Sequence, residues 1–521
     1  MSYSFWKLGR HGELAVFELF HRNNPFKGEY TILAGLDEVV KFIAHFKFTE
    51  EDITYLKSMP SLKNCEPEFF TYLSSLDCSQ VEVRAQEHGA VVFPKVPFLT
   101  VRGPMIVCQL LETTLLNLVN FPSLLATNSA RMIIEARGQF SEKLIYGKAP
   151  TCAEFGLRRA QGPDGAFSAS KYCMVGGFDA IANVIGGQKC GWPVIGTHAH
   201  SYVMSFDSLD QVKGRKIKDL KTEKEVELLE LVLKYRKELN YGNLHEGELA
   251  AFVAYALSFP HGFLCLVDTY DTLSGVKNFL TVALAMVELG YKPRGVRLDS
   301  GDLAKLSIET HKLYEEIAEK YNCKELRDLD VVASNDINEK TLRELNNKGH
   351  GITVYGIGTN LVTCQAQPAL GGVYKLTQLG NKPRIKLSSD IVKVLIPAEK
   401  RAFRLFDKSG QPFMDLLIDR KEENIPTSGT KFTVYDPFNE KKKEIEVTPF
   451  EVKEIIKPLW DGKLVKGHNA LDLNIARETC KNGIASLNPE IVRQENPRKY
   501  EVRVSGDLYD ELHHLWSSSR K

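Results

Sequence analysis

The sequence predicts an α/β protein whose central part, residues 150–365, forms a barrel of parallel strands. Two observations support this: short apolar segments alternate with helical patterns there, and each apolar segment ends in a cluster of polar or glycine residues. Parallel barrels collect their chemistry at the carboxyl ends of their strands, because those ends converge on one mouth. We therefore expect an active site built from these polar clusters.

The clearest cluster follows Gly295-Val-Arg-Leu298, a short apolar segment that carries one arginine. Asp299 and Asp302 come next, and apolar residues at helical spacing begin at Leu303. Asp302 stands where its carboxylate would accept hydrogen bonds from the first free N–H groups of that helix. An arginine and two carboxylates thus lie where a strand passes into a helix.

Neighbouring segments repeat this plan. The predicted strands Phe263–Val267, Asp330–Ala333 and Ile352–Tyr355 end in Asp268-Thr-Tyr-Asp271, Ser334-Asn-Asp336 and Gly356-Ile-Gly-Thr-Asn360. Such residues also make ordinary turns and helix caps. Four such loops in succession, one of them beside an arginine, favour the functional interpretation.

The segments on either side of the barrel are expected to build a sheet-containing domain together. Residues 1–80 are predicted to be mainly helical, strands follow from Val81, and strand patterns return after the barrel, as at residues 401–406. The predicted division is an N-terminal α/β domain over 1–140, the barrel over 150–365, a β-rich return over 366–448 and a charged, mainly helical C-terminal extension over 449–521.

The composition is that of an ordinary globular protein, and it excludes several classes. Among 521 residues, 67 are basic and 66 acidic, so no bulk charge directs the chain to nucleic acid or to a membrane surface. The most apolar long stretch, residues 105–126, is interrupted by polar residues and a proline, so we expect no membrane span. Ten cysteines without a C-x-x-C pair indicate reduced thiols in the cytosol rather than a disulfide framework or a zinc site.

Two glycine-rich segments predict a phosphate site at the last loops of the barrel. Gly358 and Thr359 follow the strand predicted over residues 352–355, and Gly371 and Gly372 come shortly after. Glycine lets backbone N–H groups approach an anion closely, and threonine adds a hydroxyl donor. Either pair alone would indicate only a turn, but barrels often bind a substrate phosphate at this place.

Two histidines alternate in Gly196-Thr-His-Ala-His-Ser201, after the apolar segment Pro193–Ile195, which we interpret as another strand. In an extended segment, His198 and His200 would point the same way. Three interpretations compete: structural histidines, a metal pair as in barrel metallohydrolases, and a nucleophilic or acid–base histidine beside a phosphate site. The metal interpretation needs further histidines at strand ends, and the later histidines of the sequence do not stand there.

Arg158 and Arg159 precede Gly162-Pro-Asp-Gly165, a strong turn signal. An arginine at such a place would donate two parallel hydrogen bonds to a phosphate or carboxylate, although a solvated surface arginine is equally consistent with this stretch. Gly176-Gly-Phe-Asp179 is a further glycine-rich loop, which either admits a ligand or only turns the chain.

These stretches carry a resemblance to a known family. In chain order they are Glu154–Gly165, Gly176–Asp179, Gly196–Ser201, Leu266–Thr272, Gly295–Leu303, Gly356–Thr359 and Gly371–Leu376. They resemble the motifs of the nicotinate phosphoribosyltransferases, a branch of the type II phosphoribosyltransferases, and weaker similarity covers nearly the whole chain. The resemblance implies an irregular TIM-like α/β barrel, an α/β sandwich domain, a small C-terminal extension and a homodimer with active sites at the subunit interface.

The resemblance also implies a role for each matching position. His200 matches the histidine that ATP phosphorylates, which couples ATP hydrolysis to mononucleotide formation. Arg297 and Thr197 match the nicotinate site, and Arg158 matches an arginine at the base site or the phosphate site. The cradle for the 5-phosphate of phosphoribosyl pyrophosphate is matched by Thr359, Gly358, Gly371 and Gly372.

The matching carboxylates are Asp268, Asp299 and Asp302, which in the family lie near the ribose and the magnesium pyrophosphate. By this resemblance, Asp268 and Asp299 act with His200 in catalysis. Asp299 and Asp302 are expected to hold Mg²⁺ or Mn²⁺, directly or through pyrophosphate or water. Carboxylate oxygens are the ligands that such hard cations prefer.

The resemblance further predicts that a short motif, Asp-Leu-Tyr-Gln, belongs before Met1, and that its tyrosine stacks on the nicotinate ring. A chain without this motif is expected to fold, because the barrel and its phosphate loops are complete. It should use nicotinate at least about tenfold less efficiently than a chain extended through this motif, unless Tyr3 or Phe5 takes the place of that tyrosine.

The predicted function is the ATP-coupled transfer of a 5-phosphoribosyl group from its pyrophosphate to the ring nitrogen of nicotinate. This is the first step of NAD synthesis from nicotinic acid. We expect the chain in the cytoplasm, with small molecules as its substrates and with neither nucleic acid nor a membrane as a partner. Three alternatives stay open at this point: the nicotinamide-using relative, a metal-dependent barrel hydrolase, and a weakly active truncated isoform that serves as a dimer partner.

Overall fold

The chain forms two compact units, and each is described by itself. Residues 1–138, 149–388, 393–493 and 495–519 are described in this computed structural model. The barrel unit consists of Arg131–Lys171 and Phe178–Gln365, and the sheet unit of Met1–Ala130, Tyr172–Gly177 and Ala366–Lys521. The division into four parts stays a prediction.

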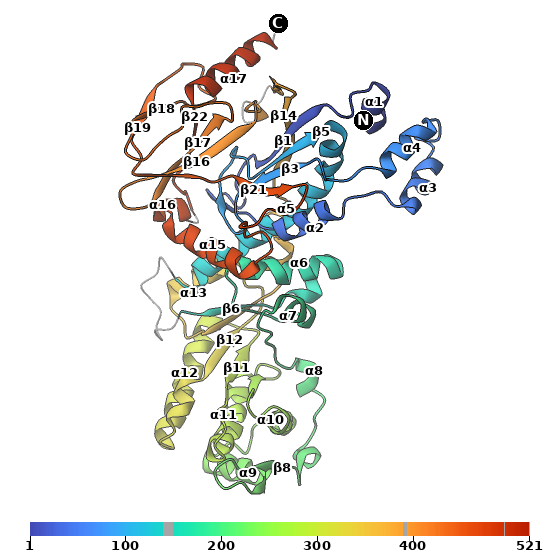
Figure 1. Ribbon diagram of the computed structural model, residues 1–521. Helices are drawn as coiled ribbons and strands as arrows, with labels where there is room; N and C mark the ends of the chain where they lie inside the picture. Colours follow the sequence, from blue (N-terminus) through green and yellow to red (C-terminus); the bar gives the residue numbers. More distant parts are fainter. Residues whose placement is uncertain (139–148, 389–392, 494, 520–521) are drawn as a thin grey trace. The chain divides into compact units, whose positions relative to one another are not determined.

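Six parallel strands form the centre of the barrel unit as far as it is described, in the spatial order β10-β11-β12-β13-β6-β7 (Figure 1). Their bounds are β6 Thr151–Glu154, β7 Ala180–Ile181, β10 Leu264–Leu266, β11 Gly295–Leu298, β12 Asp330–Ala333 and β13 Val354–Ile357. β11 and β12 have their predicted bounds. β13 lies two residues later than predicted, so that Gly356 belongs to the strand rather than to the loop after it.

Helices follow the strands and alternate with them along the chain. They are α6 Gly162–Val175, α7 Val184–Cys190, α8 His200–Val203, α9 Leu228–Glu238, α10 Glu246–Ser258, α11 Thr272–Glu288, α12 Leu303–Lys320, α13 Glu339–Lys348 and α14 Thr359–Thr363, with 3₁₀ turns η1 Leu157–Arg159, η2 Leu209–Val212 and η3 Lys324–Asp328 and a hairpin of β8 Lys216–Lys218 and β9 Glu225–Glu227. The carboxylate of Asp302 accepts a hydrogen bond from the N–H of Lys305 (3.2 Å), which confirms the predicted cap of α12.

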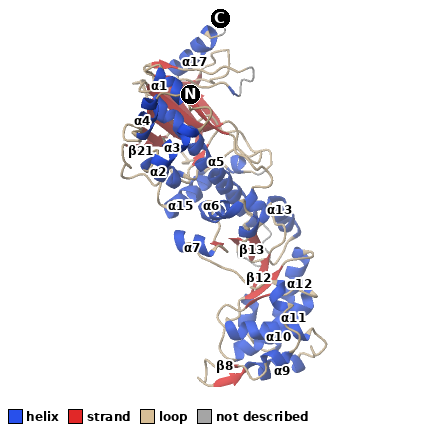
Figure 2. Ribbon diagram, turned by 90° about the vertical axis from the view of Figure 1, so that its right-hand side faces the viewer, coloured by secondary structure: helices blue, strands red, loops and turns tan. Residues whose placement is uncertain are grey.

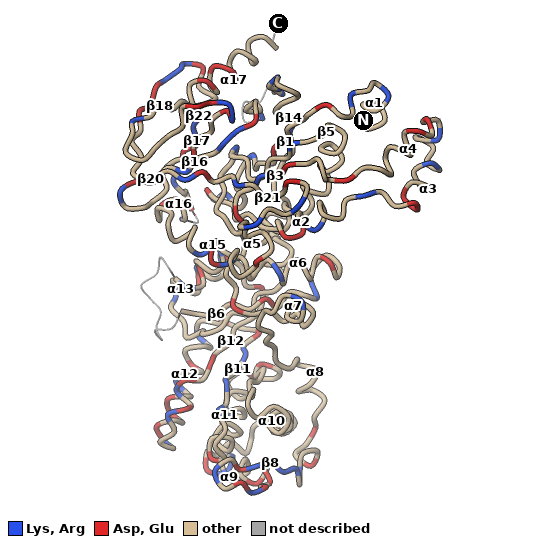
Figure 3. The backbone as a smooth tube through the Cα atoms, in the orientation of Figure 1, with Lys and Arg blue, Asp and Glu red and all other residues tan. Residues whose placement is uncertain are grey.

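The helices of this unit differ in how they meet solvent. Figure 2 shows α10, α11 and α12 packed next to one another. α11 contains few charged residues and is buried along most of its length, whereas acidic and basic residues both occur along α12 (Figure 3). α11 is therefore a core helix, and α12 covers it with an apolar face while exposing a charged one.

The extended segment 193–198 closes the ring of strands between β7 and β10. Its backbone joins Ile181 of β7 through one isolated bridge at Val194. On the other side, the hydroxyl of Thr197 donates to the carbonyl of Leu264 in β10 (2.6 Å). The barrel is thus irregular, as expected. The strand predicted over Pro193–Ile195 pairs in parallel with Ile181 through two backbone hydrogen bonds, from Ile181 to Pro193 and from Ile195 to Ile181, but it extends no further as a regular strand.

The sheet unit contains two larger sheets. One is antiparallel, in the order β15-β14-β1-β5-β3-β21, and the other has the order β20-β16-β17-β22. The strands are β1 Leu14–His21, β2 Thr31–Ile32, β3 Glu82–Ala85, β4 Val91–Val92, β5 Leu99–Pro104, β14 Gly372–Leu379, β15 Lys382–Pro383, β16 Lys400–Phe406, β17 Pro412–Asp419, β18 Phe432–Val434, β19 Ile445–Val447, β20 Glu451–Glu454, β21 Lys457–Asp461 and β22 Glu501–Val504.

The helices of this unit are α1 Ser2–Lys7, α2 Leu36–Ala44, α3 Glu50–Ser58, α4 Pro67–Ser74, α5 Met105–Ala136, α15 Leu473–Ser486, α16 Pro489–Val492 and α17 Gly506–Ser518. By length and composition α5 would be able to cross a membrane. Its side chains Leu111, Leu115 and Val119 instead lie fully buried in the core of this unit, at the spacing of one helix face. α5 is therefore packed as a core helix.

Residues 1–80 and the tail hold more helix than strand, as expected, and Glu501–Val504 forms the strand β22, but both segments also contain strands that were not expected. β1 lies in a region predicted to be mainly helical. Its sequence did not reveal a strand, because both of its faces are buried and its apolar run shows no alternation. β20 and β21 lie in the tail that was expected to be helical. β14 pairs with β1 and β21 pairs with β3, so the strands on either side of the barrel do share one sheet, as predicted.

Candidate active site

Three side chains from different loops meet at the carboxyl end of the barrel: His200, Asp268 and Asp299. Nε2 of His200 lies 3.9 Å from Oδ1 of Asp268 and 3.8 Å from Oδ2 of Asp299. The side chain of Asp268 is 2% exposed and that of His200 is 41% exposed, so a buried carboxylate faces an accessible imidazole. The structure thus brings together the three residues predicted to act in catalysis.

The carboxylate of Asp268 also joins two neighbouring loops. Its Oδ2 accepts hydrogen bonds from the N–H of Asp299 (3.1 Å) and from the hydroxyl of Ser300 (2.5 Å). Its Oδ1 is buried and has no hydrogen-bond partner among the described residues. One oxygen therefore fixes the loop after β11, while the other remains open toward His200.

Arg297 is held by two contacts beside this cluster. Its Nε donates to the hydroxyl of Ser334 (2.8 Å), and its Nη2 donates to Oδ1 of Asp299 (3.2 Å). The same hydroxyl of Ser334 donates to Oδ1 of Asp299. The guanidinium lies 5.6 Å from the centre of the Phe155 ring. Its orientation is thus fixed before any ligand binds.

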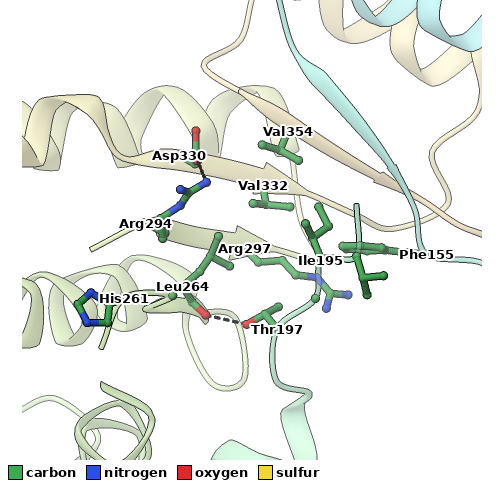
Figure 4. A pocket seen from close by; sticks show the side chains of 13 residues that line it. Phe155, Ile195, Thr197, His261, Leu264, Arg294, Arg297, Asp330, Val332 and Val354 are labelled. Carbon is green, nitrogen blue, oxygen red and sulfur yellow. Dashed lines mark hydrogen bonds and ion pairs between the residues drawn. The ribbon is translucent and has the colours of Figure 1, made fainter. Parts of the chain in front are cut away.

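A mostly apolar cavity of about 350 Å³ lies among the strands of the barrel, lined by the side chains drawn in Figure 4. Arg297 extends along it with its guanidinium near Ile195 and Phe155, while Arg294 turns toward Asp330 at 3.8 Å. The wall consists of Phe155, Val194, Ile195, Gly196, Thr197, His261, Gly262, Leu264, Arg294, Arg297, Asp330, Val332 and Val354. A flat apolar ring that carries one negative charge would match this lining.

Two further cavities adjoin the first, one of mixed lining and one almost entirely polar, and Phe155 and Arg297 line all three. One of about 220 Å³ contains Arg158, Thr197 and His200 in its wall. The other, of about 290 Å³, is lined by Arg158, Arg159, Asp299, Ser334, Asn335, Asp336, Gly356, Gly358 and Thr359, besides the two shared residues. Arg297 therefore stands where an apolar pocket meets more polar ones.

The two further cavities contain the predicted phosphate residues of the barrel unit. Arg158 lies in η1 with an exposed side chain, and the turn signal after it marks the start of α6 rather than a free loop. Gly358 is the N-cap of α14 and Thr359 is its first residue. Gly371 and Gly372 belong to the sheet unit, so their part in a shared cradle stays a prediction.

The glycines around Phe155 have a packing role that the sequence did not reveal. A Cβ at Gly356 would lie 2.5 Å from the Phe155 ring, and one at Gly156 would lie 2.8 Å from the carbonyl oxygen of Gly358. Nearby, burial raises the pKa of the Glu154 carboxyl, which accepts a hydrogen bond from Ser170 (2.9 Å). Gly356 thus leaves room for the aromatic ring at the cavity wall.

The two histidines of the alternating segment differ in their surroundings. His198 is 9% exposed, and its Nε2 accepts a hydrogen bond from the N–H of Leu266 (3.3 Å). Its ring packs against Tyr202, Phe252 and Tyr255, and burial lowers its pKa to about 4. Only one of the pair therefore faces the carboxylates, since α8 begins at His200 and ends the extended segment.

The predicted metal ligands also differ in their surroundings. Oδ2 of Asp299 and Oδ1 of Asp268 both lie near Nε2 of His200, and carboxylate oxygens of this kind suit Mg²⁺. Asp302 caps α12 and lies 3.7 Å from Lys348, and none of the three cavities has it in its wall. The part of the chain that is described holds no group of three or more His, Cys, Asp or Glu ligands. The residues fit a Mg²⁺ ion that takes most of its ligands from substrate oxygens.

Comparison with known proteins identifies the family. The nicotinate phosphoribosyltransferase (NAPRTase) N-terminal domain matches residues 1–120, and the nicotinate phosphoribosyltransferase C-terminal domain matches residues 399–512. A nicotinate phosphoribosyltransferase of Dictyostelium discoideum is 48% identical over 100% of this chain and 87% of its own length. Nicotinate phosphoribosyltransferase 1 of Arabidopsis thaliana is 46% identical over 99% of this chain and 92% of its own length.

The chain belongs to the nicotinate phosphoribosyltransferase family. The crystal structure of human nicotinic acid phosphoribosyltransferase has a TM-score of 0.87 and 38% identity, and the match covers 99% of this chain and 98% of that one. The expected α/β fold and the expected family are thereby confirmed. The role of each site residue stays a prediction.

Three residues of this candidate site were not singled out from the sequence. Ser334 and Thr269 stood only inside polar clusters, and Phe155 stood only inside a matching stretch. Thr269 lies 3.1 Å from Nδ1 of His200, measured to its hydroxyl oxygen. No pattern of spacing reveals such contacts, because they join residues that are about 35 or more positions apart along the chain.

Proposed function

We propose that this chain catalyses the ATP-coupled formation of nicotinate mononucleotide and pyrophosphate from nicotinate and 5-phosphoribosyl pyrophosphate. One observation carries the proposal: Arg297 lies where the apolar cavity meets the cluster of His200, Asp268 and Asp299. A cation for a carboxylate, an apolar wall for a ring and an imidazole beside carboxylates are thus combined in one place.

Nicotinate would bind with its ring in the apolar cavity and its carboxylate on Arg297. Because Nε and Nη2 are already occupied by Ser334 and Asp299, the guanidinium offers its remaining N–H groups. A charge-assisted hydrogen bond of this kind contributes about 1.5–3 kcal/mol. Thr197 lines the same cavity, but its hydroxyl is engaged with the carbonyl of Leu264, so it shapes the wall.

The phosphoribosyl group would lie in the two further cavities. Arg158 and Arg159 supply positive charge, and Gly358 and Thr359 would bind the 5-phosphate. The reaction forms a bond from the pyridine nitrogen to C1 of the ribose and breaks the bond from C1 to the pyrophosphate oxygen. Asp268 and Asp299 would stabilise the positive charge that develops on the ribose.

A Mg²⁺ ion, when bound with pyrophosphate, would neutralise charge on the leaving group. Asp299 and Asp268 are the residues that would hold it or its water ligands, because each has one open carboxylate oxygen. Asp302 belongs to the proposal only as a more distant ligand through water, since it already caps α12.

His200 would accept the γ-phosphoryl group of ATP at Nδ1. Asp268 and Asp299 face Nε2, and ionised carboxylates only accept hydrogen bonds, so they favour the proton at Nε2. The lone pair of neutral imidazole then lies on Nδ1. In the transfer, a bond forms between Nδ1 and phosphorus, the bond to the bridging oxygen breaks, and ADP leaves. Water later hydrolyses the phosphohistidine to phosphate.

The proposal also covers the localisation, the oligomeric state and the domain division of the chain. We infer a cytosolic homodimer with active sites at its subunit interface, and we retain the four-part division 1–140, 150–365, 366–448 and 449–521.

An activity assay separates this function from its rivals. The chain is incubated with phosphoribosyl pyrophosphate, Mg²⁺ and either nicotinate, nicotinamide or quinolinate, with and without ATP, and any mononucleotide and pyrophosphate are identified. We expect nicotinate mononucleotide, formed faster with ATP. Product from nicotinamide alone would favour the nicotinamide-using relative, and no product at all would favour a dimer partner.

Substitution of His200 tests the ATP step. His200→Ala should abolish ATP hydrolysis and the acid-labile phosphate on the protein, while slow, ATP-independent transfer survives because the substrates are still positioned. His198→Phe is the matched control, because His198 packs against aromatic rings and does not face the carboxylates. Acid-labile phosphate on the His200→Ala protein would contradict the assignment.

A further inference from the structure

The loop Asp268-Thr-Tyr-Asp271, which follows β10, is fixed by contacts to four different parts of the barrel unit. Asp268 accepts hydrogen bonds from the backbone of Asp299 and from Ser300, in the loop after β11. The ring of Tyr270 stacks on His245, with centroids 3.8 Å apart. Asp271 caps α11 by accepting a hydrogen bond from the N–H of Ser274 (2.9 Å).

Thr269 is the remaining member of this loop, and its hydroxyl oxygen lies 3.1 Å from Nδ1 of His200. Its two neighbours are anchored by hydrogen bonds and by a ring stack, so the position of its hydroxyl is fixed with little freedom. α11 packs closely on the backbone just before the loop, because a Cβ at Gly275 of α11 would lie 2.0 Å from the carbonyl oxygen of Val267.

The imidazole of His200 is therefore held on both sides. The carboxylates face Nε2 at 3.9 and 3.8 Å, and the hydroxyl lies against Nδ1. With the proton on Nε2, Nδ1 is an acceptor and the hydroxyl of Thr269 is its donor. A ring flipped by 180° about its Cβ–Cγ bond would exchange Nδ1 with Cδ2 and Nε2 with Cε1, so that carbon atoms would face the hydroxyl and the carboxylates and both interactions would be lost.

We propose that Thr269 is a positioning residue for His200, a role that rests on the phosphorylation of His200 proposed above. Its hydroxyl fixes the plane and the tautomer of the imidazole before transfer. When the phosphoryl group of ATP arrives, the Nδ1–phosphorus bond forms, the bond to ADP breaks, and the hydroxyl transfers its hydrogen bond from Nδ1 to a phosphoryl oxygen. No proton leaves Thr269 in this step.

The test compares Thr269→Val, which keeps the shape and removes the hydroxyl, with Thr269→Ser, which keeps the hydroxyl. Each full-length protein is mixed with radiolabelled ATP and Mg²⁺, and the rate of labelling is measured. Alkaline digestion then shows whether the label is on Nδ1 or on Nε2. Thr272→Val, three positions further on at the first turn of α11, is the matched control.

We expect Thr269→Val to be labelled about threefold to tenfold more slowly, as for the loss of one hydrogen bond, with part of the label moved to Nε2. Thr269→Ser and Thr272→Val should match the wild type in rate and in isomer. The KM for nicotinate in the ATP-independent reaction should be unchanged in all of them, which also shows that Thr269→Val is folded.

Equal labelling of Thr269→Val and wild type, on the same nitrogen, would overturn the role of Thr269 alone. Slow labelling of Thr269→Ser would overturn it as well, because the methyl group and not the hydroxyl would then be the cause. An unlabelled wild-type protein, by contrast, would overturn the phosphorylation of His200 itself and with it this inference.

Discussion

Two arginine–aspartate pairs, one in each unit, have similar chemistry and different surroundings. In the sheet unit, Arg404 donates from Nε and Nη2 to the two oxygens of Asp415 at 2.8 and 2.9 Å. In the barrel unit, Arg297 makes one hydrogen bond of 3.2 Å to Asp299. Each guanidinium lies over a phenylalanine ring, at 5.1 Å for Arg404 and 5.6 Å for Arg297.

The difference lies in what remains unsatisfied. The carboxylate of Asp415 is fully buried and also accepts a hydrogen bond from Tyr500 (3.0 Å), and Arg404 donates to the carbonyl of Val91 (3.0 Å). Arg297 instead lines three cavities. The closed pair fixes the packing of its sheet, whereas the open pair keeps donors and acceptors for a ligand.

The largest expected effect is on the closed pair. Asp415→Ala leaves a buried guanidinium without its carboxylate, and breaking such a pair costs about 3–5 kcal/mol. Urea denaturation should show this loss in the free energy of unfolding. Asp299→Ala, its counterpart in the site, should cost less than about 1 kcal/mol in stability and should abolish most activity. Similar losses of stability in both variants would remove the distinction between the pairs.

The next effect concerns the open pair. Arg297→Ala should raise the KM for nicotinate about ten- to a hundredfold, since about 1.5–3 kcal/mol of binding is lost, and should leave the KM for ATP nearly unchanged. Arg297→Lys should restore only part of the affinity, because a point charge cannot reproduce the planar guanidinium. Arg294→Ala is the control from the same cavity wall. An unchanged KM for nicotinate in Arg297→Ala would make Arg297 structural, like Arg404.

Both units also bury a neutral histidine, and here they should behave alike. Burial lowers the pKa of His21 in the sheet unit to about 3 and that of His198 in the barrel unit to about 4. In the unfolded chain each histidine binds a proton as the pH falls through about 6.5, whereas in the folded chain it stays neutral until a lower pH. The free energy of unfolding therefore keeps its full value above about pH 6.5 and decreases as the pH falls toward the pKa of the folded state. At pH 5 the loss is about 2 kcal/mol for each histidine.

This acid effect is measured by the free energy of unfolding at pH 7 and at pH 5. His21→Phe and His198→Phe should each flatten the pH dependence by a similar amount, because an unpaired or weakly paired imidazole is replaced by an apolar ring. A variant whose stability still falls as steeply as that of the wild type would show that its histidine is protonated in the folded state.

The smallest effect is expected at Ser334, whose hydroxyl joins Arg297 to Asp299. Ser334→Ala should lower kcat/KM for nicotinate about threefold to tenfold, because Arg297 loses one of its two anchors and keeps its hydrogen bond to Asp299. Stability should change little. Ser170→Ala, which removes a buried hydroxyl from Glu154 in the same unit, is a control for the general cost of such a loss.

Local sequence rules gave the elements around the site. The bounds of β11 and β12 and the cap of α12 by Asp302 rest on hydrogen bonds within four residues or on short apolar runs. Such features depend on neighbours in the chain, so a pattern of a few residues determines them. The resemblance to a family then assigned roles that the pattern alone left open.

The tertiary structure decided which polar residues meet. Asp268 accepts a hydrogen bond from the backbone of Asp299 because β10 and β11 pair in parallel, with Leu266 opposite Arg297. Parallel pairing of β11 with β12 likewise places Ser334 next to Arg297. Strand register is set by packing across the whole barrel, and no spacing within one segment encodes it.

The two histidines show the same limit most clearly. Sequence alone made His198 and His200 equivalent members of one alternating segment, and only the family resemblance favoured His200. In the structure the segment ends where α8 begins, so His198 packs among aromatic rings while His200 meets Thr269 and two carboxylates. The sequence by itself thus determined that an imidazole would stand at the end of this extended segment. Which imidazole meets the carboxylates was decided by long-range packing, because burial and partners come from segments far away in the sequence.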